Sequence, residues 1–209
     1  IALAFAGLAA LSSCSDFLDK TPKEELSDAS FWKDSNDAEM YVSDMYNYLG
    51  GSEDKPIENT DEAINTDDAT MGIKWAAGNE SKGVYDPSDY GWSTEYTYIR
   101  EANLALEKIP TVEMDDATRK KLEGQAYFFR GYIYWNLIQN FGSVPYVDKP
   151  LTLSDLHDIE QSSREDVYAK AMADLDKAIE DLPEEWDASA YGRITKGAAR
   201  AVKMRAAMY

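Results

Sequence analysis

Apolar side chains are densest between residues 115 and 145, where their spacing predicts one long helix. Asp115 or Asp116 can cap the start of this helix, and Gly142 can end it. From residue 126 onward the apolar positions lie on two sides of the helix. One stripe is Ala126, Phe129, Ile133 and Leu137, and the other is Tyr127, Tyr134, Ile138 and Phe141. A helix that is apolar on two faces must pack on both, so we expect a neighbouring helix on each side of it.

Small and polar residues within this helix refine the expectation. Gly124, Ala126 and Gly131 are poor choices by bulk or helix propensity, and they make sense where another helix approaches closely. A membrane-spanning helix is the alternative interpretation of so apolar a run. It fails because polar residues interrupt the run well short of the ~20 apolar residues that a span requires. The interrupting residues are Arg130, Asn136, Gln139 and Asn140.

The same periodicity predicts four more helices, at residues 34–49, 94–109, 164–182 and 195–209. Residues 50–93, between the first two of these, are rich in Gly, Asn, Asp and Ser and show no helical pattern. We therefore expect a long irregular loop region there. A loop of this length inside a compact domain is uncommon, and it is more often functional than not.

An internal repeat relates two parts of the chain at an offset of 73 residues. Residues 105–110, Ala-Leu-Glu-Lys-Ile-Pro, align with residues 178–183, Ala-Ile-Glu-Asp-Leu-Pro. At the same offset, Gly124, Ala126 and Phe129 align with Gly197, Ala199 and Val202. Each copy is a helix that ends in proline, a linker, and a second helix with small residues at its start. This pattern predicts an all-α, tetratricopeptide-like helical repeat, because helices in such stacks bury both faces against their neighbours.

The first 13 residues carry no charged side chain and suit the apolar region of a secretory signal. The basic start of such a signal is absent, so we interpret residues 1–13 as a partial lipoprotein signal peptide. Residues 11–14, Leu-Ser-Ser-Cys, resemble the bacterial lipobox, which makes Cys14 the predicted lipid attachment site and residues 14–33 a lipidated N-terminal segment. A buried or incidental Cys14 is the alternative. Because residues 195–209 end without a stop signal, we expect a chain truncated at both ends.

Composition excludes some classes of function. The chain has 209 residues, 44% of them hydrophobic, which suffices for a substantial core. Its formal net charge of -18 argues against nucleic-acid binding, because a phosphate backbone would be repelled. Such a charge is typical of a well-solvated surface. A single cysteine supports neither a disulfide framework nor a thiolate metal cluster.

The sequence contains no recognisable catalytic constellation. His157 is the one histidine, is expected in a loop, and lacks a second imidazole to share a zinc ion. Motifs for nucleophilic serine, nucleotide phosphate or dinucleotide binding are absent. Calcium is conceivable at four carboxylates, although their spacing does not match an EF-hand loop; these are Asp61, Glu62, Asp67 and Asp68. We therefore expect no enzyme, no cofactor and no metal.

Aromatic side chains in residues 50–93 are the better candidates for a site. Trp75, with Asn79, Tyr85 and Tyr90, could form a platform on which the C–H faces of sugars stack. The side-chain amide of Asn79 could form hydrogen bonds with sugar hydroxyl groups. The alternative is that these rings fix the loop onto the helices. For Trp92, just before a predicted helix, packing is favoured, whereas for Trp75 both interpretations stay open. Packing is expected for Tyr127, Tyr132, Tyr134 and Trp135.

Several segments in order resemble the SusD/RagB family of outer-membrane nutrient-binding lipoproteins. The lipobox cysteine begins Cys-Ser-Asp-Phe-Leu-Asp at residues 14–19, and Tyr-Ile-Arg-Glu-Ala-Asn follows at residues 98–103. The most specific segments are Gly-Gln-Ala-Tyr-Phe-Phe-Arg-Gly-Tyr at residues 124–132, Phe-Gly-Ser-Val-Pro at residues 141–145, and Arg-Ile-Thr-Lys-Gly-Ala-Ala at residues 193–199. The resemblance covers nearly the whole chain, but the family's C-terminal half is absent.

The resemblance implies a domain layout and a function. Residues 34–209 would be an incomplete N-terminal helical-repeat domain of a protein anchored by lipid at the cell surface of the outer membrane. Such proteins capture oligosaccharides without chemistry and pass them to a TonB-dependent, SusC-like transporter. Two alternatives stay open: a lipid-anchored repeat scaffold that binds only protein, and a glycosidase whose catalytic half lies elsewhere.

Overall fold

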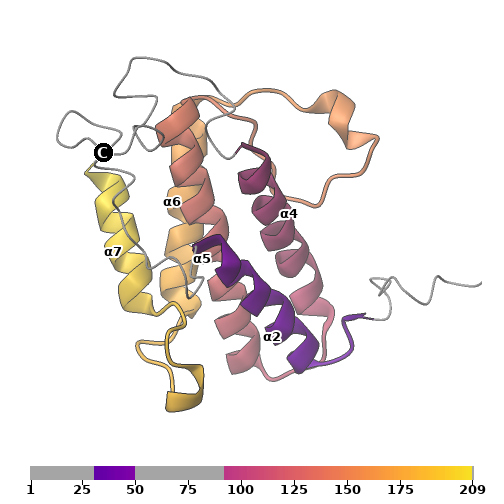
Figure 1. The fold of residues 1–209 in the computed structure, drawn as a ribbon, viewed down its shortest axis with the longest axis vertical. Coiled ribbons are helices and arrows are strands. Elements are labelled where there is room, and N and C mark those ends of the chain that lie inside the picture. The colour runs from indigo at the N-terminus through magenta and orange to yellow at the C-terminus, as the bar shows by residue number, and fades with distance from the viewer. Residues whose placement is uncertain (1–30, 50–91, 209) are drawn as a thin grey trace, which may run out of the picture.

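The structure is a computed structural model that describes residues 31–49 and 92–208 (Figure 1). Its α-helices are α2 (Ser35–Asp44), α4 (Trp92–Lys108), α5 (Asp116–Phe141), α6 (Arg164–Asp181) and α7 (Lys196–Ala207). Short 3-10 helices are η2 (Met45–Leu49), η5 (Ile109–Thr111), η6 (Asp155–Asp158) and η7 (Ala188–Ala190). The extended structure in these ranges is one isolated antiparallel bridge between Val144 and Ser162. The described part of the chain is therefore all-α, as the sequence predicts.

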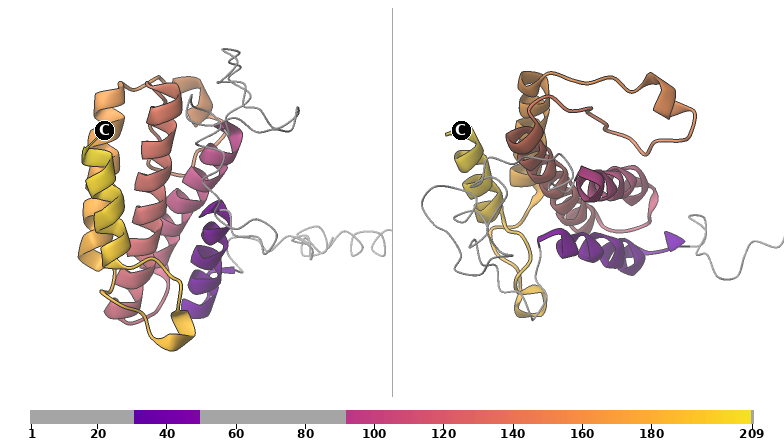
Figure 2. Two further views of the ribbon diagram at one scale, coloured as in Figure 1. Left: turned by 60° about the vertical axis from the view of Figure 1, so that its left-hand side comes forward. Right: turned by 45° about the horizontal axis from the view of Figure 1, so that its top comes forward.

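The four helices of the repeat lie side by side in the order in which they occur along the chain. Figures 1 and 2 show α4, α5, α6 and α7 as neighbours, with successive helices running in opposite directions. Helix α2 crosses over α4 and α5 on one side of this row. Helix α5 thus contacts α4 on one side and α6 on the other, while α2 and part of α7 also reach it. This is the two-sided packing that the apolar pattern of α5 predicts.

The ends of α5 are capped as predicted. The Asp115 carboxylate accepts a hydrogen bond of 2.9 Å from the backbone N–H of Thr118, which satisfies one of the free donors of the first turn. At the other end Gly142 has φ 71°, a left-handed conformation that glycine adopts without steric cost. Gly142 also donates to the carbonyl oxygen of Ile138 at 3.1 Å. The turn that follows directs the chain away from the row of helices.

Both predicted stripes of α5 are in the core. The four residues of the first stripe are buried, and so are Tyr134 and Ile138 of the second. Gly131 of α5 lies where α6 approaches closely, and Gly124 lies where the C-terminal end of α6 does. A Cβ atom at Gly124 would come within 3.1 Å of Leu182, and one at Gly131 within 2.8 Å of the carbonyl oxygen of Ala171. The prediction of close helix approach at these two glycines is confirmed.

Helix boundaries differ from the predictions by a few residues. The helix expected at residues 34–49 is α-helical only to Asp44 and continues as the 3-10 helix η2, a common way for a helix to end. Helix α4 begins at Trp92, two residues before the predicted start, and its 3-10 extension contains Pro110, which cannot continue an α-helix. The predicted ends of α6 and α7 are correct to within one or two residues, with Ser163 and Thr195 as N-caps.

The 73-residue offset matches the helix boundaries of the first helix in each pair. Adding 73 to the bounds of α4 gives residues 165–181, against Arg164–Asp181 for α6. Ala126 and Ile133 of α5 correspond to Ala199 and Ala206 of α7, and all four are buried. The glycines differ, however, because Gly124 packs against Leu182 whereas Gly197 is exposed and would place a Cβ near Thr195 alone. The close-approach role predicted for Gly124 therefore does not extend to Gly197 among the described residues.

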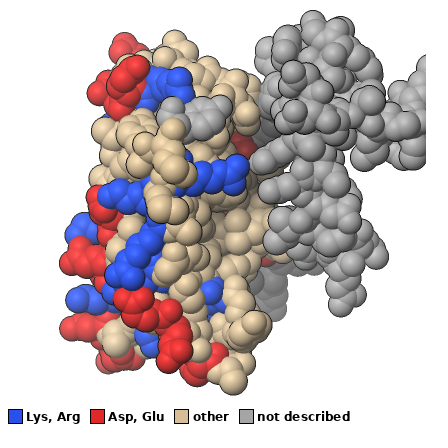
Figure 3. All heavy atoms as spheres, turned by 90° about the vertical axis from the view of Figure 1, so that its left-hand side faces the viewer, with Lys and Arg blue, Asp and Glu red and all other residues tan. Residues whose placement is uncertain are grey.

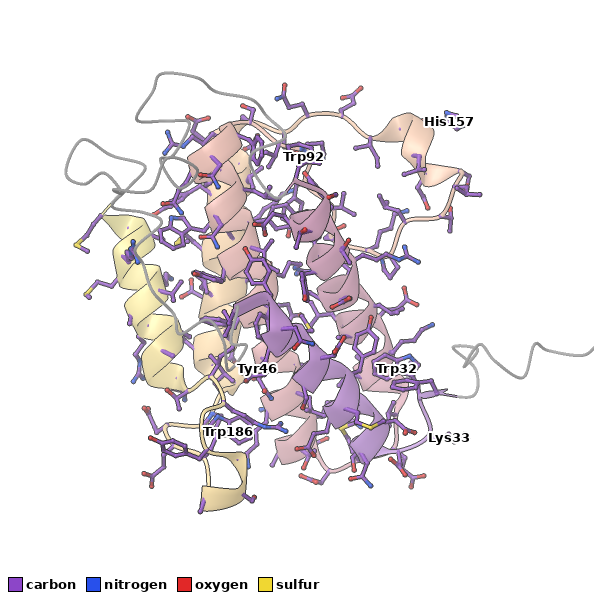
Figure 4. All side chains as sticks on the ribbon, viewed as in Figure 1. Trp32, Lys33, Tyr46, Trp92, His157 and Trp186 are labelled. Atoms are coloured by element: carbon purple, nitrogen blue, oxygen red, sulfur yellow. The ribbon has the colours of Figure 1, made fainter. Side chains whose placement is uncertain are left out.

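The connection between α6 and α7 contacts η2, the 3-10 helix that follows α2. The Tyr46 hydroxyl donates a hydrogen bond of 2.7 Å to Gln125 of α5 and accepts one of 3.0 Å from the backbone N–H of Ile194. Trp186 donates from its indole N–H to the carbonyl oxygen of Ile194 at 2.8 Å. Figure 4 shows Tyr46 and Trp186 at this same end of the molecule. One tyrosine side chain thus joins η2, α5 and the residue before the N-cap of α7.

The surface near α7 is mixed in charge. Figure 3 shows lysines and arginines gathered on the face that carries α7, with acidic side chains beside them. Arg200 pairs with Glu184 at 3.2 Å and Lys203 pairs with Asp176, so basic residues of α7 lie against acidic ones of α6 and its C-terminal connection. None of the helices in the described ranges combines the length and the apolar character needed to cross a bilayer.

Candidate functional site

A cleft of about 780 Å³ opens between α4 and the loop that joins α5 to α6. Its volume falls within the range of sites for small molecules, roughly 300–1,000 Å³. Figure 1 shows this loop as a wide excursion beside the N-terminal end of α4. The lining is mostly apolar and aromatic: Trp92, Tyr96, Ile99, Arg100, Asn103, Pro145, Val147, Lys149, Leu151, Thr152, Leu153, Leu156 and Ile159. We take this cleft as the candidate functional site of the described residues.

The two ends of the loop are tied together at its base. Val144 and Ser162 form the isolated antiparallel bridge, and the Ser162 N–H donates to the Val144 carbonyl oxygen at 3.1 Å. Gln161 donates from its side chain to the Ser143 carbonyl oxygen at 2.8 Å. These contacts close the base of the loop, so the chain leaves the helices and returns to them at one place.

A buried ion pair holds the first part of the loop against the helices. Arg130 of α5 donates to Asp174 of α6 and, at 2.9 Å, to the amide oxygen of Asn103 in α4. The amide nitrogen of Asn103 in turn donates to the backbone carbonyl oxygens of Val147 at 3.0 Å and Lys149 at 3.3 Å. Since the helices fix Asn103, they also fix the loop backbone that forms the inner wall of the cleft.

Two tyrosines add further anchors. The Tyr134 hydroxyl accepts from the backbone N–H of Val147 at 2.6 Å and donates to its carbonyl oxygen at 3.0 Å. The Tyr96 hydroxyl donates to the Pro145 carbonyl oxygen at 2.7 Å. Burial raises the pKa of Tyr134 far above its ordinary value, and the hydrogen bond from Val147 opposes this rise. Both phenols therefore stay protonated and hold the loop over the whole physiological pH range.

Trp92 stands at the rim of the cleft, at the first residue of α4. Its ring contacts Tyr96 at a centroid distance of 5.0 Å and meets the edge of Phe141 at 4.9 Å. The side chain is still 40% exposed. Figure 4 shows Trp92 at the end of α4 next to the loop. The packing predicted for Trp92 is confirmed, but the residue begins the helix rather than preceding it, and it also lines the cleft.

Two cationic side chains lie along the lining. Arg100 donates to the Leu151 carbonyl oxygen at 2.8 Å, and Lys149 forms an ion pair of 2.8 Å with Asp155. Asp155 also accepts from the backbone N–H of Thr152 at 2.8 Å. The hydrogen bonds from Lys149 and then from Thr152 hold the pKa of the Asp155 carboxyl below its usual range.

The tip of the loop carries apolar and polar side chains into solvent. Leu153 is 85% exposed and Leu156 is 54% exposed, although both line the mouth of the cleft. His157 lies in η6 and is exposed, as expected for a loop residue, and Figure 4 shows it at the outer edge of the loop. His157 is not part of any cluster of metal-ligating side chains in residues 31–49 and 92–208, where no group of three or more such residues gathers.

Several sequence predictions fall outside the described residues. These are the aromatic platform of Trp75, Asn79, Tyr85 and Tyr90, the lipid attachment site Cys14, and the calcium candidates Asp61, Glu62, Asp67 and Asp68. Sequence reasoning missed Arg100 and Lys149 as lining residues. Arg100 follows Trp92 and Tyr96 at four-residue spacing, which puts all three on one helix face, so a sequence signal for Arg100 did exist. For Lys149, in an irregular loop, no such signal exists.

Comparison with known proteins places the chain in a family. A family model described as "Starch-binding associating with outer membrane" matches residues 16–207. The chain belongs to the SusD-like family. The resemblance inferred from the sequence motifs is thereby confirmed, and so is the all-α helical-repeat fold.

Relatives of this chain are considerably longer than it is. SusD-like protein P38 from Formosa agariphila is 28% identical over 196 residues, covering 84% of this chain and 35% of the relative. A crystal structure of a SusD-like protein from Bacteroides fragilis superposes with a TM-score of 0.73 at 28% identity, covering 91% of this chain and 38% of that protein. A laminarin-binding SusD-like protein superposes with a TM-score of 0.68 at 25% identity, covering 85% and 41%. The chain spans about two fifths or less of the length of each.

Proposed function

We propose that this SusD-like chain belongs to a cell-surface lipoprotein that binds oligosaccharides without transforming them. Family membership supports a glycan ligand, since one similar structure is named for binding laminarin. The observation that carries the proposal is the cleft between α4 and the α5–α6 loop, with the half-exposed ring of Trp92 at its rim. Sugar rings present C–H faces that stack on such an aromatic surface.

The hydrogen-bonding groups of the cleft suit binding rather than catalysis. The Tyr96 hydroxyl and the Asn103 amide nitrogen donate to the loop backbone, and the Asn103 amide oxygen accepts from Arg130. These two residues therefore shape the wall instead of reaching the ligand. Arg100, Lys149 and Thr152 are exposed and can bond sugar hydroxyl groups. An open site of this kind, with one stacking ring and a few hydrogen bonds, fits affinities on the order of micromolar to millimolar, or roughly 4–8 kcal/mol. Such weak binding allows release to a second protein.

We further propose that the lipid on Cys14 holds the protein at the outer membrane, where it passes ligand to a TonB-dependent, SusC-like transporter. The family description, which includes association with the outer membrane, supports this location. Acyl chains partition into a bilayer at ~0.8 kcal/mol per buried CH₂, so two or three chains give a stable anchor. The aromatic platform of Trp75, Asn79, Tyr85 and Tyr90 is proposed as a further part of the ligand site.

A repeat scaffold that binds only protein is the second candidate. The exposed leucines at the tip of the loop favour it, because large apolar side chains exposed together can mark contacts with a partner. The two candidates differ in which surface matters. A glycan-binding protein depends on Trp92 at the rim, whereas a protein-binding scaffold depends on Leu153 and Leu156 and needs no stacking ring.

Calorimetric titration of the full-length protein with a panel of oligosaccharides tests the proposal. We expect at least one glycan to bind, and Trp92→Ala to weaken that binding at least several-fold while Trp92→Phe has a smaller effect. Tyr191→Ala is the matched control, because Tyr191 is an aromatic side chain that is 93% exposed and lies outside the cleft. Equal binding by the wild-type protein and Trp92→Ala would remove Trp92 from the site, and failure of every glycan to bind would contradict the proposed function.

A further inference from the structure

The charges that line the cleft are all of one sign. The whole chain has 39 acidic residues against 21 lysines and arginines. Among the thirteen residues that line the cleft, however, the charged ones are Arg100 and Lys149, and neither Asp nor Glu is present. In a strongly acidic protein, the lining of this cleft thus carries only positive charges, which raises the local electrostatic potential there.

Arg100 has hydrogen-bonding capacity to spare. Its guanidinium donates one hydrogen bond to the Leu151 carbonyl oxygen at 2.8 Å, and none of the ion pairs found in residues 31–49 and 92–208 includes it. An arginine carries five N–H donors in a planar fork that matches the two oxygens of a carboxylate or sulfate. One guanidinium N–H of Arg100 is thus bonded to the loop, and the remaining N–H groups can bind an anion.

Acidic side chains gather in a second hollow beside the cleft. This smaller hollow of about 280 Å³ shares part of its lining with the cleft, and it also includes Asp148, Asp155, Asp158 and Glu160. Lys149 lines both hollows and pairs with Asp155 of the acidic hollow, so the Asp155 carboxylate partly neutralises its charge. Arg100 lines only the larger cleft, and no ion pair in the described ranges neutralises its charge there. Arg100 is therefore the residue on which an anionic ligand would depend.

We infer that the cleft binds an acidic oligosaccharide, one carrying carboxylate or sulfate groups, with an anionic group on Arg100 and a sugar ring on Trp92. This inference rests on the proposed function, to which it adds the class of glycan. Trp92, Tyr96 and Arg100 lie on one face of α4 at four-residue spacing. Eight residues of helix span ~12 Å, so a ligand that reaches both Trp92 and Arg100 contains more than one sugar.

Titration of the full-length protein with three probes of equal length tests the inference: a neutral β-glucan, an oligogalacturonate and a sulfated galactan. We expect an acidic probe to bind more tightly than the neutral one, and its affinity to fall with added salt, because screening weakens charge–charge attraction. The carboxylated and the sulfated probe distinguish the two possible anions. A preference for either supports the inference and identifies the group.

Arg100 variants connect this preference to the cleft. We expect Arg100→Gln to weaken binding of the acidic probe by about tenfold or more and to weaken binding of the neutral probe by a clearly smaller factor, because glutamine keeps a hydrogen-bond donor for hydroxyl groups but loses the charge. Arg100→Lys keeps the charge but not the planar fork, so it should recover part of the affinity for the acidic probe. A merely structural role in holding Leu151 would instead change binding of the acidic and neutral probes by similar factors. Arg164→Gln is the matched control, since Arg164 is exposed on α6 and is not part of the cleft.

The outcomes separate this inference from the proposed function. If the neutral probe binds as tightly as the acidic ones and Arg100→Gln changes neither, the inference is overturned while glycan binding stands. If no probe binds, glycan binding itself is contradicted and the inference falls with it. If Arg100→Gln lowers the melting temperature, the probe preference of the wild-type protein, its salt dependence and the Arg100→Lys variant decide the question.

Discussion

Arg130 donates two hydrogen bonds of 2.7 Å, from Nε and Nη2, to the two carboxylate oxygens of Asp174. Both side chains are less than 10% exposed. The pair crosses from α5 to α6, and through Asn103 it also reaches α4 and the loop that walls the cleft. Desolvation raises the pKa of the Asp174 carboxyl, and the hydrogen bonds from Arg130 oppose that rise. A buried, bidentate ion pair between α5 and α6 is therefore connected, through Asn103, to α4 and to one wall of the candidate site.

We predict that Asp174→Asn lowers the free energy of unfolding by about 3–5 kcal/mol, because it leaves the buried Arg130 charge without its partner. Chemical denaturation of the folded chain measures this loss. Glu180→Gln is the control, since Glu180 pairs with Lys177 on the exposed face of the same helix and should cost under about 1 kcal/mol. Equal losses in the two variants would show that the buried pair contributes no more than a surface one.

A second prediction concerns the two glycines with contrasting surroundings. Gly131→Ala or Gly131→Leu should destabilise the protein by about 1–3 kcal/mol, because the new Cβ would meet the Ala171 carbonyl oxygen at 2.8 Å. Gly197→Ala should stabilise it by about 0.5–1 kcal/mol, since alanine favours the helix and the position is open. Thermal melting of both variants tests this difference. An unchanged melting temperature for Gly131→Leu would count against close packing of α5 on α6.

A third prediction concerns pH. Burial raises the pKa of the Glu95 carboxyl, hydrogen bonding by Tyr48 opposes the rise, and Oε2 is buried without a hydrogen-bond partner. Because the native pKa exceeds the ordinary value of 4.5, this group's contribution to stability is fully present below that pH and is lost as pH rises through the native pKa.

Glu95→Gln should remove that part of the pH dependence. We expect the unfolding free energy of the variant to decline less between pH 4.5 and pH 7 than that of the wild-type protein, and to equal or exceed it at pH 7. Glu107→Gln, at an exposed position of the same helix, is the control. Parallel stability curves for wild type and Glu95→Gln would show that Glu95 is not the cause of the decline.

A fourth prediction concerns membrane attachment. Cys14→Ala should abolish labelling by fatty acid in cells and shift the full-length protein from the membrane fraction to the soluble fraction, because the proposed lipid attachment site is lost. Ser13→Ala, which alters the neighbouring residue and keeps the cysteine, is the control. Continued labelling of the Cys14→Ala protein would place the anchor at another residue.

The sequence predicts the fold of the described residues closely because its signals are local. Helix α5 has a capping aspartate, a terminating glycine and two apolar stripes, and each of these acts within a few residues of itself. The repeat offset adds a long-range relation that aligns α4 with α6. The exposure of Gly197 was not predictable, since it depends on whether another helix lies beside α7, and the sequence of α7 does not state this.

The candidate site was only partly predictable. Trp92 was identified as a packing residue, but its place at the rim of a cleft depends on a loop some 50 residues further along the chain. The path of that loop is set by hydrogen bonds from Asn103, Tyr96 and Tyr134 to its backbone. Contacts of this kind involve backbone carbonyl groups, which every residue carries, and N–H groups, which every residue except proline carries, and so they leave no trace in the loop's own sequence.

The difference in anchoring between the base and the tip of the loop has an evolutionary consequence. Residues 144–151 and 162 include backbone groups that are tied to the helices or to each other, whereas Leu153, Leu156 and His157 at the tip are exposed. Substitutions at the tip can therefore alter the mouth of the cleft without a penalty in folding. Lineages exposed to different polymers could diversify this short segment while leaving the helical frame untouched, and an engineer could graft new tips onto it in the same way.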